Sequence, residues 1–149
     1  MKMLISAAAV AAATLLSAMP ALAADPNAPV FDNGPVWDYS MVQTKDGHFD
    51  DYMTWLSTSW KAQEEARKKA GVITDYKVLL VSSPRGNEPD IILAEQYKNM
   101  AAFDRTPADD YALQAKIFGS IPKSNEQQAA RGTIRTILGD VLVREAILK

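Results

Sequence analysis

His48 has the clearest capacity for acid–base chemistry in this chain, because an imidazole changes its charge near neutral pH. It is the only histidine and lies in the stretch TKDGHFDDYMTWL, where Asp50 and Asp51 follow it closely. A metal site needs several converging ligands, and the sequence offers neither a second histidine nor a cysteine. Two interpretations stay open: His48 is a base that lines a cleft, or it is a polar residue in the first turn of a helix.

Aromatic side chains with polar tips form a second group of candidates. Trp37 and Tyr39 share one face of an expected strand, and Tyr97 ends another strand. Such side chains suit an apolar pocket that positions an organic ligand, and they suit a core or a subunit interface even better. We predict that Tyr39 acts with His48 as a catalytic residue, and that Trp37 and Tyr97 contact a ligand.

Arginines form the third group. Arg131 and Arg135 are four residues apart, which predicts that they share one face of a helix, and Arg144 lies in the last strand. A guanidinium group is shaped to bind a carboxylate or a phosphate, so Arg131 and Arg135 are predicted ligand-binding residues. The competing interpretation is surface ion pairing with Glu126 or Glu145. The sequence has no glycine-rich phosphate loop, nucleophile elbow or zinc-ligand spacing.

The elements that position these residues can be predicted from periodicity and from turn residues. Strand-like alternation and helix-like spacing follow one another along the chain, separated by Pro, Gly and Asn. The expected order is strand 35–44, helix 48–70, strand 73–82, strand 90–97, a short helical turn 99–103, a helix from Pro107 to Gly119, a helix from a capping box at Ser124–Gln127 to about Leu138, and strand 140–148.

The helix over 48–70 has the strongest signal. Its apolar residues recur at spacings of three and four, acidic residues occupy its first turn, and basic residues occupy its last turn. Asp46 or Gly47 is predicted to cap its start, and Gly71 to end it.

The strands over 78–81 and 91–94 are apolar on both faces, which indicates that both faces of the sheet are covered. The βαββαβ order predicts an α+β, ferredoxin-like fold, with an antiparallel four-stranded sheet and helices on one face. We expect a second copy of the chain to cover the other face, so the partner is the protein itself, as a homodimer.

The sequence resembles the dimeric α+β barrel superfamily in DGHFDDYMTWL, AEQYKNMAAFD and RTILGDVLVREAIL, across residues 35–148. The resemblance implies a homodimer with a ligand cleft between each sheet and its helices. The superfamily includes cofactor-free oxygenases, isomerases, haem enzymes and members without known activity, so the resemblance does not assign a reaction. Haem would need His48, whose place at the start of a helix does not suit that role. We predict no cofactor and no metal.

The first 23 residues resemble a cleaved signal peptide. Lys2 precedes an apolar run over 4–16, and Ala21-Leu22-Ala23 matches the small-x-small pattern that signal peptidase accepts. We therefore expect domain limits of 1–23 for the signal, 24–34 for an irregular lead-in and 35–149 for a single α+β barrel domain. The mature protein would be periplasmic or secreted, and no other segment suggests a membrane span.

A net charge of −2 without a basic stripe argues against nucleic acid as a partner. We predict an exported protein that binds a small organic ligand and is a cofactor-independent oxygenase or isomerase. The alternative is a module without catalysis, for binding, for stress or for interaction with another protein.

Overall fold

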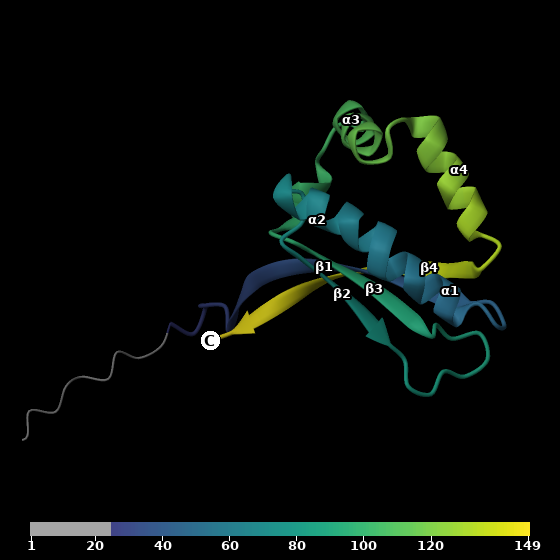
Figure 1. The fold of residues 1–149 in the computed structure, drawn as a ribbon. Helices are drawn as coiled ribbons and strands as arrows, with labels where there is room; N and C mark the ends of the chain where they lie inside the picture. Colours follow the sequence, from purple (N-terminus) through teal and green to yellow (C-terminus); the bar gives the residue numbers. More distant parts are fainter. Residues whose placement is uncertain (1–24) are drawn as a thin grey trace, which may run out of the picture.

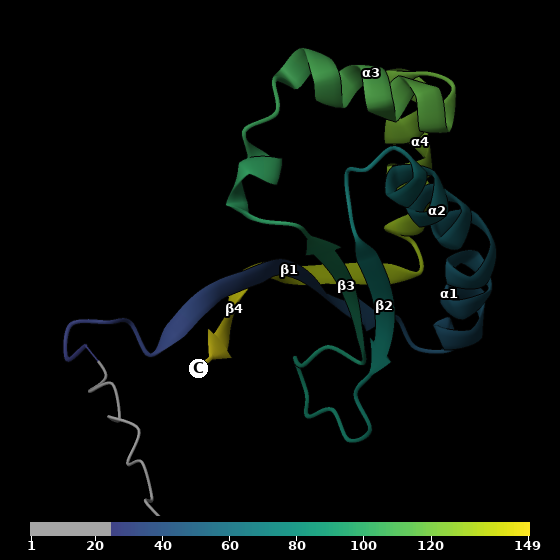
Figure 2. The same cartoon turned by 90° about the vertical axis from the view of Figure 1, so that its left-hand side faces the viewer.

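The computed structural model describes residues 25–149, and the expected signal peptide over 1–23 lies outside them. One antiparallel sheet forms the base of the molecule, and the helices lie on one side of it (Figures 1 and 2). Within the described part, no helix is long and apolar enough to cross a membrane.

The sheet has the order β2-β3-β1-β4 and consists of β1 (Phe31–Thr44), β2 (Asp75–Leu80), β3 (Ile91–Tyr97) and β4 (Arg135–Leu148). All neighbouring pairs are antiparallel, and the two long strands lie side by side from Phe31 opposite Leu148 to Thr44 opposite Arg135. This topology confirms the ferredoxin-like fold predicted from the order of elements. β1 begins four residues earlier than predicted and takes in the end of the expected lead-in.

The first helical segment is continuous over 49–69, close to the prediction, but it contains an irregular turn. It comprises α1 (Phe49–Trp55), the π-helical turn η1 (Leu56–Trp60) and α2 (Lys61–Lys69). His48 is the N-cap, in place of the predicted Asp46 or Gly47, and its side chain makes no capping hydrogen bond. Gly71 has a φ of 73°, in agreement with its predicted position after the helix.

The second helical region differs more from the prediction. The turn η2 (Met100–Phe103) and α3 (Pro107–Phe118) are capped by Asn99 and Thr106, as expected. The next helix, α4 (Ile121–Arg131), begins after Ser120, whose hydroxyl accepts a hydrogen bond from the backbone of Lys123. The predicted capping box at Ser124 was wrong, because Pro122 is tolerated in the first turn of a helix and does not break the chain there.

The predicted end of that helix, near Leu138, was also wrong. β4 already begins at Arg135. A register shift opposite Met41 and Val42 leaves Leu138 as an extra residue on β4, and Gly139 adopts a φ of 150° there. The apolar residues over 134–138 fit a helix and a bulged strand equally well, so spacing alone could not separate the two.

Two apolar clusters join the helices to the sheet. The larger one packs the first helical segment on the Val42 end of β1, and the smaller one lies at the Val36 end. Between Val36 and Val42, the same face of β1 carries Asp38 and Ser40, because alternate residues of a strand share a face. The helix-facing side of the sheet is therefore polar at its centre. The clusters contain Val42, Tyr52, Leu56, Trp60, Ile91 and Leu93, and Val36, Ile73 and Tyr97.

Candidate functional site

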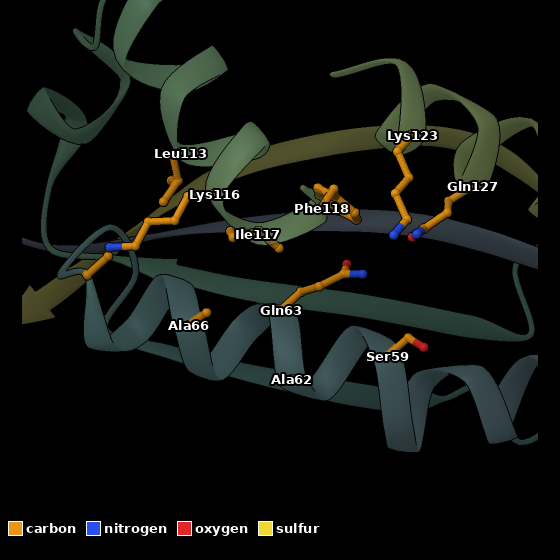
Figure 3. Close-up of a pocket in the computed structure, with 11 residues that line it drawn as sticks. Ser59, Ala62, Gln63, Ala66, Leu113, Lys116, Ile117, Phe118, Lys123 and Gln127 are labelled. Atoms are coloured by element: carbon orange, nitrogen blue, oxygen red, sulfur yellow. The ribbon is translucent and has the colours of Figure 1, made fainter. Parts of the chain in front are cut away.

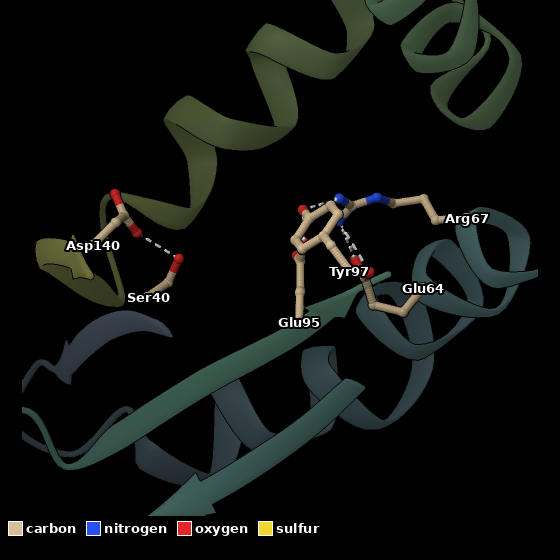
Figure 4. Close-up of polar contacts among 6 residues, drawn as sticks. All are labelled: Ser40, Glu64, Arg67, Glu95, Tyr97 and Asp140. Carbon is tan, nitrogen blue, oxygen red and sulfur yellow. Dashed lines mark hydrogen bonds and ion pairs between the residues drawn. The ribbon is translucent and has the colours of Figure 1, made fainter. Parts of the chain in front are cut away.

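A row of acidic and hydroxyl side chains crosses the centre of the helix-facing side of the sheet. Asp38 on β1 is directly opposite Glu95 on β3, and Ser40 is opposite Asp140 on β4. The Ser40 hydroxyl donates a hydrogen bond of 2.5 Å to Oδ1 of Asp140 (Figure 4). Two carboxylates in a direct cross-strand pair destabilise a sheet. This arrangement therefore needs a reason other than folding.

Four residues from α2 and β3 surround one end of this row, and we call them the Arg67 cluster: Glu64, Arg67, Glu95 and Tyr97. Nη1 of Arg67 lies 2.7 Å from Oε1 of Glu95 and 3.0 Å from Oε2 of Glu64. Nη2 donates to the Tyr97 hydroxyl at 2.9 Å, and that hydroxyl donates to Oε2 of Glu95 at 2.7 Å (Figure 4). Arg67 thus holds two carboxylates and a phenol in one fixed arrangement.

Burial disturbs the protonation of this region. Glu64 is only 3% exposed, and burial together with the charge of Glu95 raises its pKa to about 7, although Arg67 acts in the opposite direction. Burial also raises the pKa of Asp38, and the carboxylates of Glu95 and Asp140 raise it further. Burial and the charge of Glu95 raise the pKa of Tyr97, so its hydroxyl keeps its proton.

These shifts give the site acid–base capacity. Asp38 is half-buried, faces the helices and shows no side-chain hydrogen bond to any residue over 25–149. A carboxylate with a raised pKa and free lone pairs can accept a proton from a substrate. The Arg67 cluster keeps Glu95 beside Asp38 and so maintains the repulsion that raises the Asp38 pKa.

Two cavities are lined by residues of α2. One of about 290 Å³ is lined by Arg67 and Tyr97 of the cluster, with Phe103 and the ion-paired residues Arg105 and Asp110 at its rim. Another of about 440 Å³ lies between α2 and the helices α3 and α4, where Gln63, Lys123 and Gln127 point toward one another (Figure 3). Volumes of this size can hold a small organic molecule.

The predicted catalytic pair is not brought together. His48 lies at the helix start with its side chain 42% exposed, and its Nδ1 is 2.8 Å from Oδ2 of Asp51. Tyr39 lies on the other face of the sheet, turned away from the helices, because it alternates with Asp38 and Ser40. A cleft between sheet and helices therefore cannot contain both residues.

Trp37 shares that helix-free face, where it stacks on Tyr39 with ring centroids 6.0 Å apart. Its Nε1 donates to Glu145 at 2.8 Å, and Nζ of Lys77 lies 4.7 Å from its ring centroid. The interpretation of Trp37 and Tyr39 as residues of an interface thus fits their position better than the interpretation as pocket residues. Tyr97, by contrast, does line a cavity beside the polar row.

Arg131 and Arg135 do not share a helix face, because Arg131 ends α4 and Arg135 begins β4. Both nevertheless reach α1. The guanidinium carbon of Arg131 lies 4.3 Å from the ring centroid of Trp55, and that of Arg135 lies 5.6 Å from the ring centroid of Tyr52. Arg131 and Arg135 therefore lie near each other because of the turn between α4 and β4, and not because of helical spacing as predicted. Arg144 lies exposed on β4, and no ion pair with Glu126 or Glu145 is seen within residues 25–149.

Sequence reasoning missed Asp38, Glu64, Arg67 and Glu95, although a signal for two of them was present. The buried positions Tyr52, Leu56 and Trp60 are four residues apart, and the next step of the series is Glu64. Burying a charged residue at the next position of such a stripe costs folding free energy, so its presence there indicates a functional role. Asp38 likewise interrupts the apolar series that runs from Val36 to Val42.

Over the described range of 25–149, no group of three or more His, Cys, Asp or Glu side chains could hold a metal ion. The carboxylates of the polar row are instead arranged around Arg67 and Ser40.

No protein-family model matches the chain, and no curated protein matches it. Solved structures with a similar fold include HapK from Hahella chejuensis, with 11% identity, a TM-score of 0.48 and coverage of 74% of this chain and 91% of that chain. Protein SO0527 from Shewanella oneidensis has 13% identity and a TM-score of 0.48, and the match covers 78% of this chain and 96% of that chain. A dimeric protein of unknown function and ferredoxin-like fold from Bacteroides fragilis has 16% identity, a TM-score of 0.43 and coverage of 77% and 97%. The resemblance stays at the level of the fold and assigns no activity.

Proposed function

We propose that this protein binds a small, partly apolar organic molecule between its sheet and helices and catalyses a proton transfer without a cofactor, as an isomerase does. The observation that carries the proposal is the pair Asp38–Glu95 at the centre of the helix-facing side of the sheet. Burial and like charge raise the pKa of Asp38, which favours a carboxylate that takes up a proton and returns it.

Each residue of the site has a defined role in this proposal. Asp38 is the base that removes a proton from carbon, and the Tyr97 hydroxyl, which donates to Glu95 in this structure, turns its proton toward the oxygen where negative charge develops. Arg67 is a positioning residue, because it fixes Glu95 at 2.7 Å and Tyr97 at 2.9 Å. A cofactor-free oxygenase would share the proton-removal step and differ by consuming oxygen.

Deuterium exchange tests this proposal directly. The protein is incubated in D2O with a panel of enolisable ketones and keto acids, and exchange at the carbon next to the carbonyl is followed by NMR. We expect exchange to fall by about a hundredfold or more in Asp38→Asn. The matched control Asp104→Asn changes an exposed aspartate and should keep the wild-type rate. Exchange no faster than in buffer across the panel, or an undiminished rate in Asp38→Asn, contradicts the proposal.

We also propose that the protein is a homodimer whose copies meet through the helix-free face of the sheet. Leu79, Val141 and Val143 on this face are 39%, 46% and 38% exposed, beside Tyr39 and Met41. Two charged side chains of this face, Lys77 and Glu145, contact Trp37. They have opposite signs, so two copies of the face do not repel each other. An apolar face of this kind is typical of a subunit interface.

Sedimentation equilibrium at micromolar concentration tests the dimer. We expect a dimer for the wild type and a monomer for Val141→Glu, since a buried unpaired charge at the interface is costly. Val30→Glu places the same charge on an exposed residue before β1 and should remain dimeric. A wild-type monomer would refute the proposed dimer.

We retain export to the periplasm or beyond as a proposal. It rests on the sequence pattern of residues 1–23, and N-terminal sequencing of the protein from the exported fraction tests it. A mature chain that starts at Ala24 is the expected result, and an intact Met1 would contradict it.

A further inference from the structure

We infer that Arg131 and its surroundings form a binding site for the oxyanion head of an amphipathic organic ligand, with the apolar body of that ligand lying along the groove between α2 and α3. The inference goes beyond the proposed function, because neither Asp38 nor Glu95 lines this groove, and it does not require proton transfer.

Arg131 is the central observation. It is 8% exposed, and its Nε and Nη1 atoms are buried without a hydrogen-bond partner in the part of the chain that the structure describes. Its guanidinium carbon lies over the Trp55 ring, 4.3 Å from the ring centroid. A buried cation without a carboxylate or an acceptor is strongly unfavourable, so this arrangement calls for an anion.

Two further donors near Arg131 also lack acceptors. Nε of Arg135 and the hydroxyl of Tyr52, which is fully buried, have no hydrogen-bond partner within residues 25–149. Arg135 lies over the Tyr52 ring, and its charge adds to burial in lowering the pKa of Arg131. Two arginines that repel each other would both gain from a bound negative charge.

The space beside Arg131 is hollow. A groove of about 360 Å³ is lined by Trp55, Ser59, Gln127 and Arg131, together with Ala130 and Ile134. The Ser59 hydroxyl and the Gln127 amide can donate hydrogen bonds, so three kinds of donor border the same groove. The π-helical turn η1 contains Ser59, and such turns occur often at functional sites.

The groove continues into the cavity of about 440 Å³, because Ser59 and Gln127 line both (Figure 3). Beyond them, Ala62 and Ala66 of α2 are opposite Ile117 of α3. Lys116 and Lys123 also line this cavity. The surface therefore combines cationic and apolar side chains, which suits a carboxylate or phosphate joined to a hydrocarbon chain.

Calorimetric titration with octanoate, octyl phosphate, inorganic phosphate and 1-octanol tests the inference. We expect octanoate or octyl phosphate to bind the wild type more tightly than inorganic phosphate, and to lose about tenfold or more in affinity in Arg131→Met. The weak binding of 1-octanol should not change in that variant. Whichever of the two amphiphiles binds more tightly identifies the head group as carboxylate or phosphate.

Arg131→Met should fold, because it replaces a buried unpaired cation by an apolar side chain of similar length, and circular dichroism checks this. Arg85→Met is the matched control on the exposed β2–β3 loop and should bind as the wild type does. Equal affinity of Arg131→Met and wild type for both amphiphiles, or inorganic phosphate binding as tightly as octyl phosphate, overturns the inference.

The two proposals can fail separately. Asp38-dependent deuterium exchange without binding of either amphiphile overturns the anion site alone. Arg131-dependent binding in a protein that catalyses no exchange supports the anion site and overturns the proton-transfer proposal alone.

Discussion

The substitution Glu64→Gln should make the stability of this protein less sensitive to pH. Glu64 is buried in the Arg67 cluster, where burial and Glu95 raise its pKa to about 7. Glutamine has nearly the same shape and keeps an oxygen that can accept a hydrogen bond from Arg67. The substitution therefore removes the titration and preserves most of the contact.

The sign of the effect follows from proton binding. Between pH 4.5 and about 7, the folded protein keeps a proton on Glu64 that the unfolded chain has already released. Unfolding then releases a proton, so the free energy of unfolding falls as the pH rises through this window. At 1.36 kcal/mol per pKa unit, the gap between the ordinary value of 4.5 and a value of about 7 corresponds to about 3 kcal/mol.

Urea denaturation followed by tryptophan fluorescence measures this contribution. The free energy of unfolding of Glu64→Gln minus that of the wild type should increase by about 3 kcal/mol between pH 4.5 and pH 8. Taking this difference at one protein concentration cancels other titrating groups and any dimer contribution. Glu126→Gln changes an exposed residue of α4 and should follow the wild-type profile throughout.

A difference that stays constant within about 1 kcal/mol over this range, or one that falls with pH, would refute the reasoning. Either result would mean that Glu64 is ionised in the folded protein at low pH, with Arg67 outweighing burial and the repulsion from Glu95. The acid–base interpretation of the whole cluster would then lose its electrostatic basis.

Three further substitutions test the packing of the fold by thermal and urea denaturation. Tyr52→Phe removes a buried hydroxyl that has no partner over 25–149, so stability without ligand should rise by about 1 kcal/mol; a loss of that size would reveal a missing acceptor. Gly34→Ala places a Cβ atom 2.8 Å from Cβ of Glu145, and we expect a loss of about 1–3 kcal/mol unless the ends of β1 and β4 separate freely. Thr106→Ala removes the N-cap bond to Asp109 and should cost about 1 kcal/mol, whereas Thr106→Ser should cost little.

The fold could be predicted because its elements have strong local signals. Alternation in β1 and β3 and the capped stripe of the first helical segment each depend on a few neighbouring residues. The boundary between α4 and β4 could not be predicted in this way. Ile134, Ile137 and Leu138 satisfy helical spacing, and only the pairing of Ile137 with Val42 of a distant strand decides for β4.

The candidate site was harder to predict, because it depends on which face of β1 meets the helices. Alternation separates Trp37 and Tyr39 from Asp38 and Ser40 but does not say which pair is covered. The prediction chose Trp37 and Tyr39 because they are aromatic, but they lie on the helix-free face, which does not border a cleft between sheet and helices. Asp38 becomes significant only when Glu95 of β3 and Arg67 of α2 are placed around it.

The first helical segment separates two concentrations of charge that do not neutralise each other. Near Trp55 and Ser59 lies Arg131, buried without an anion among the described residues, and at Glu64 and Arg67 lies the carboxylate-rich polar row. At a rise of 1.5 Å per residue, the eight steps from Ser59 to Arg67 span about 12 Å of helix. Stability alone would favour pairing these charges or replacing them by apolar residues. A ligand with an anionic head at Arg131 would supply the missing negative charge, and the groove that leads away from that arginine offers apolar side chains such as Ile117 to the rest of that ligand.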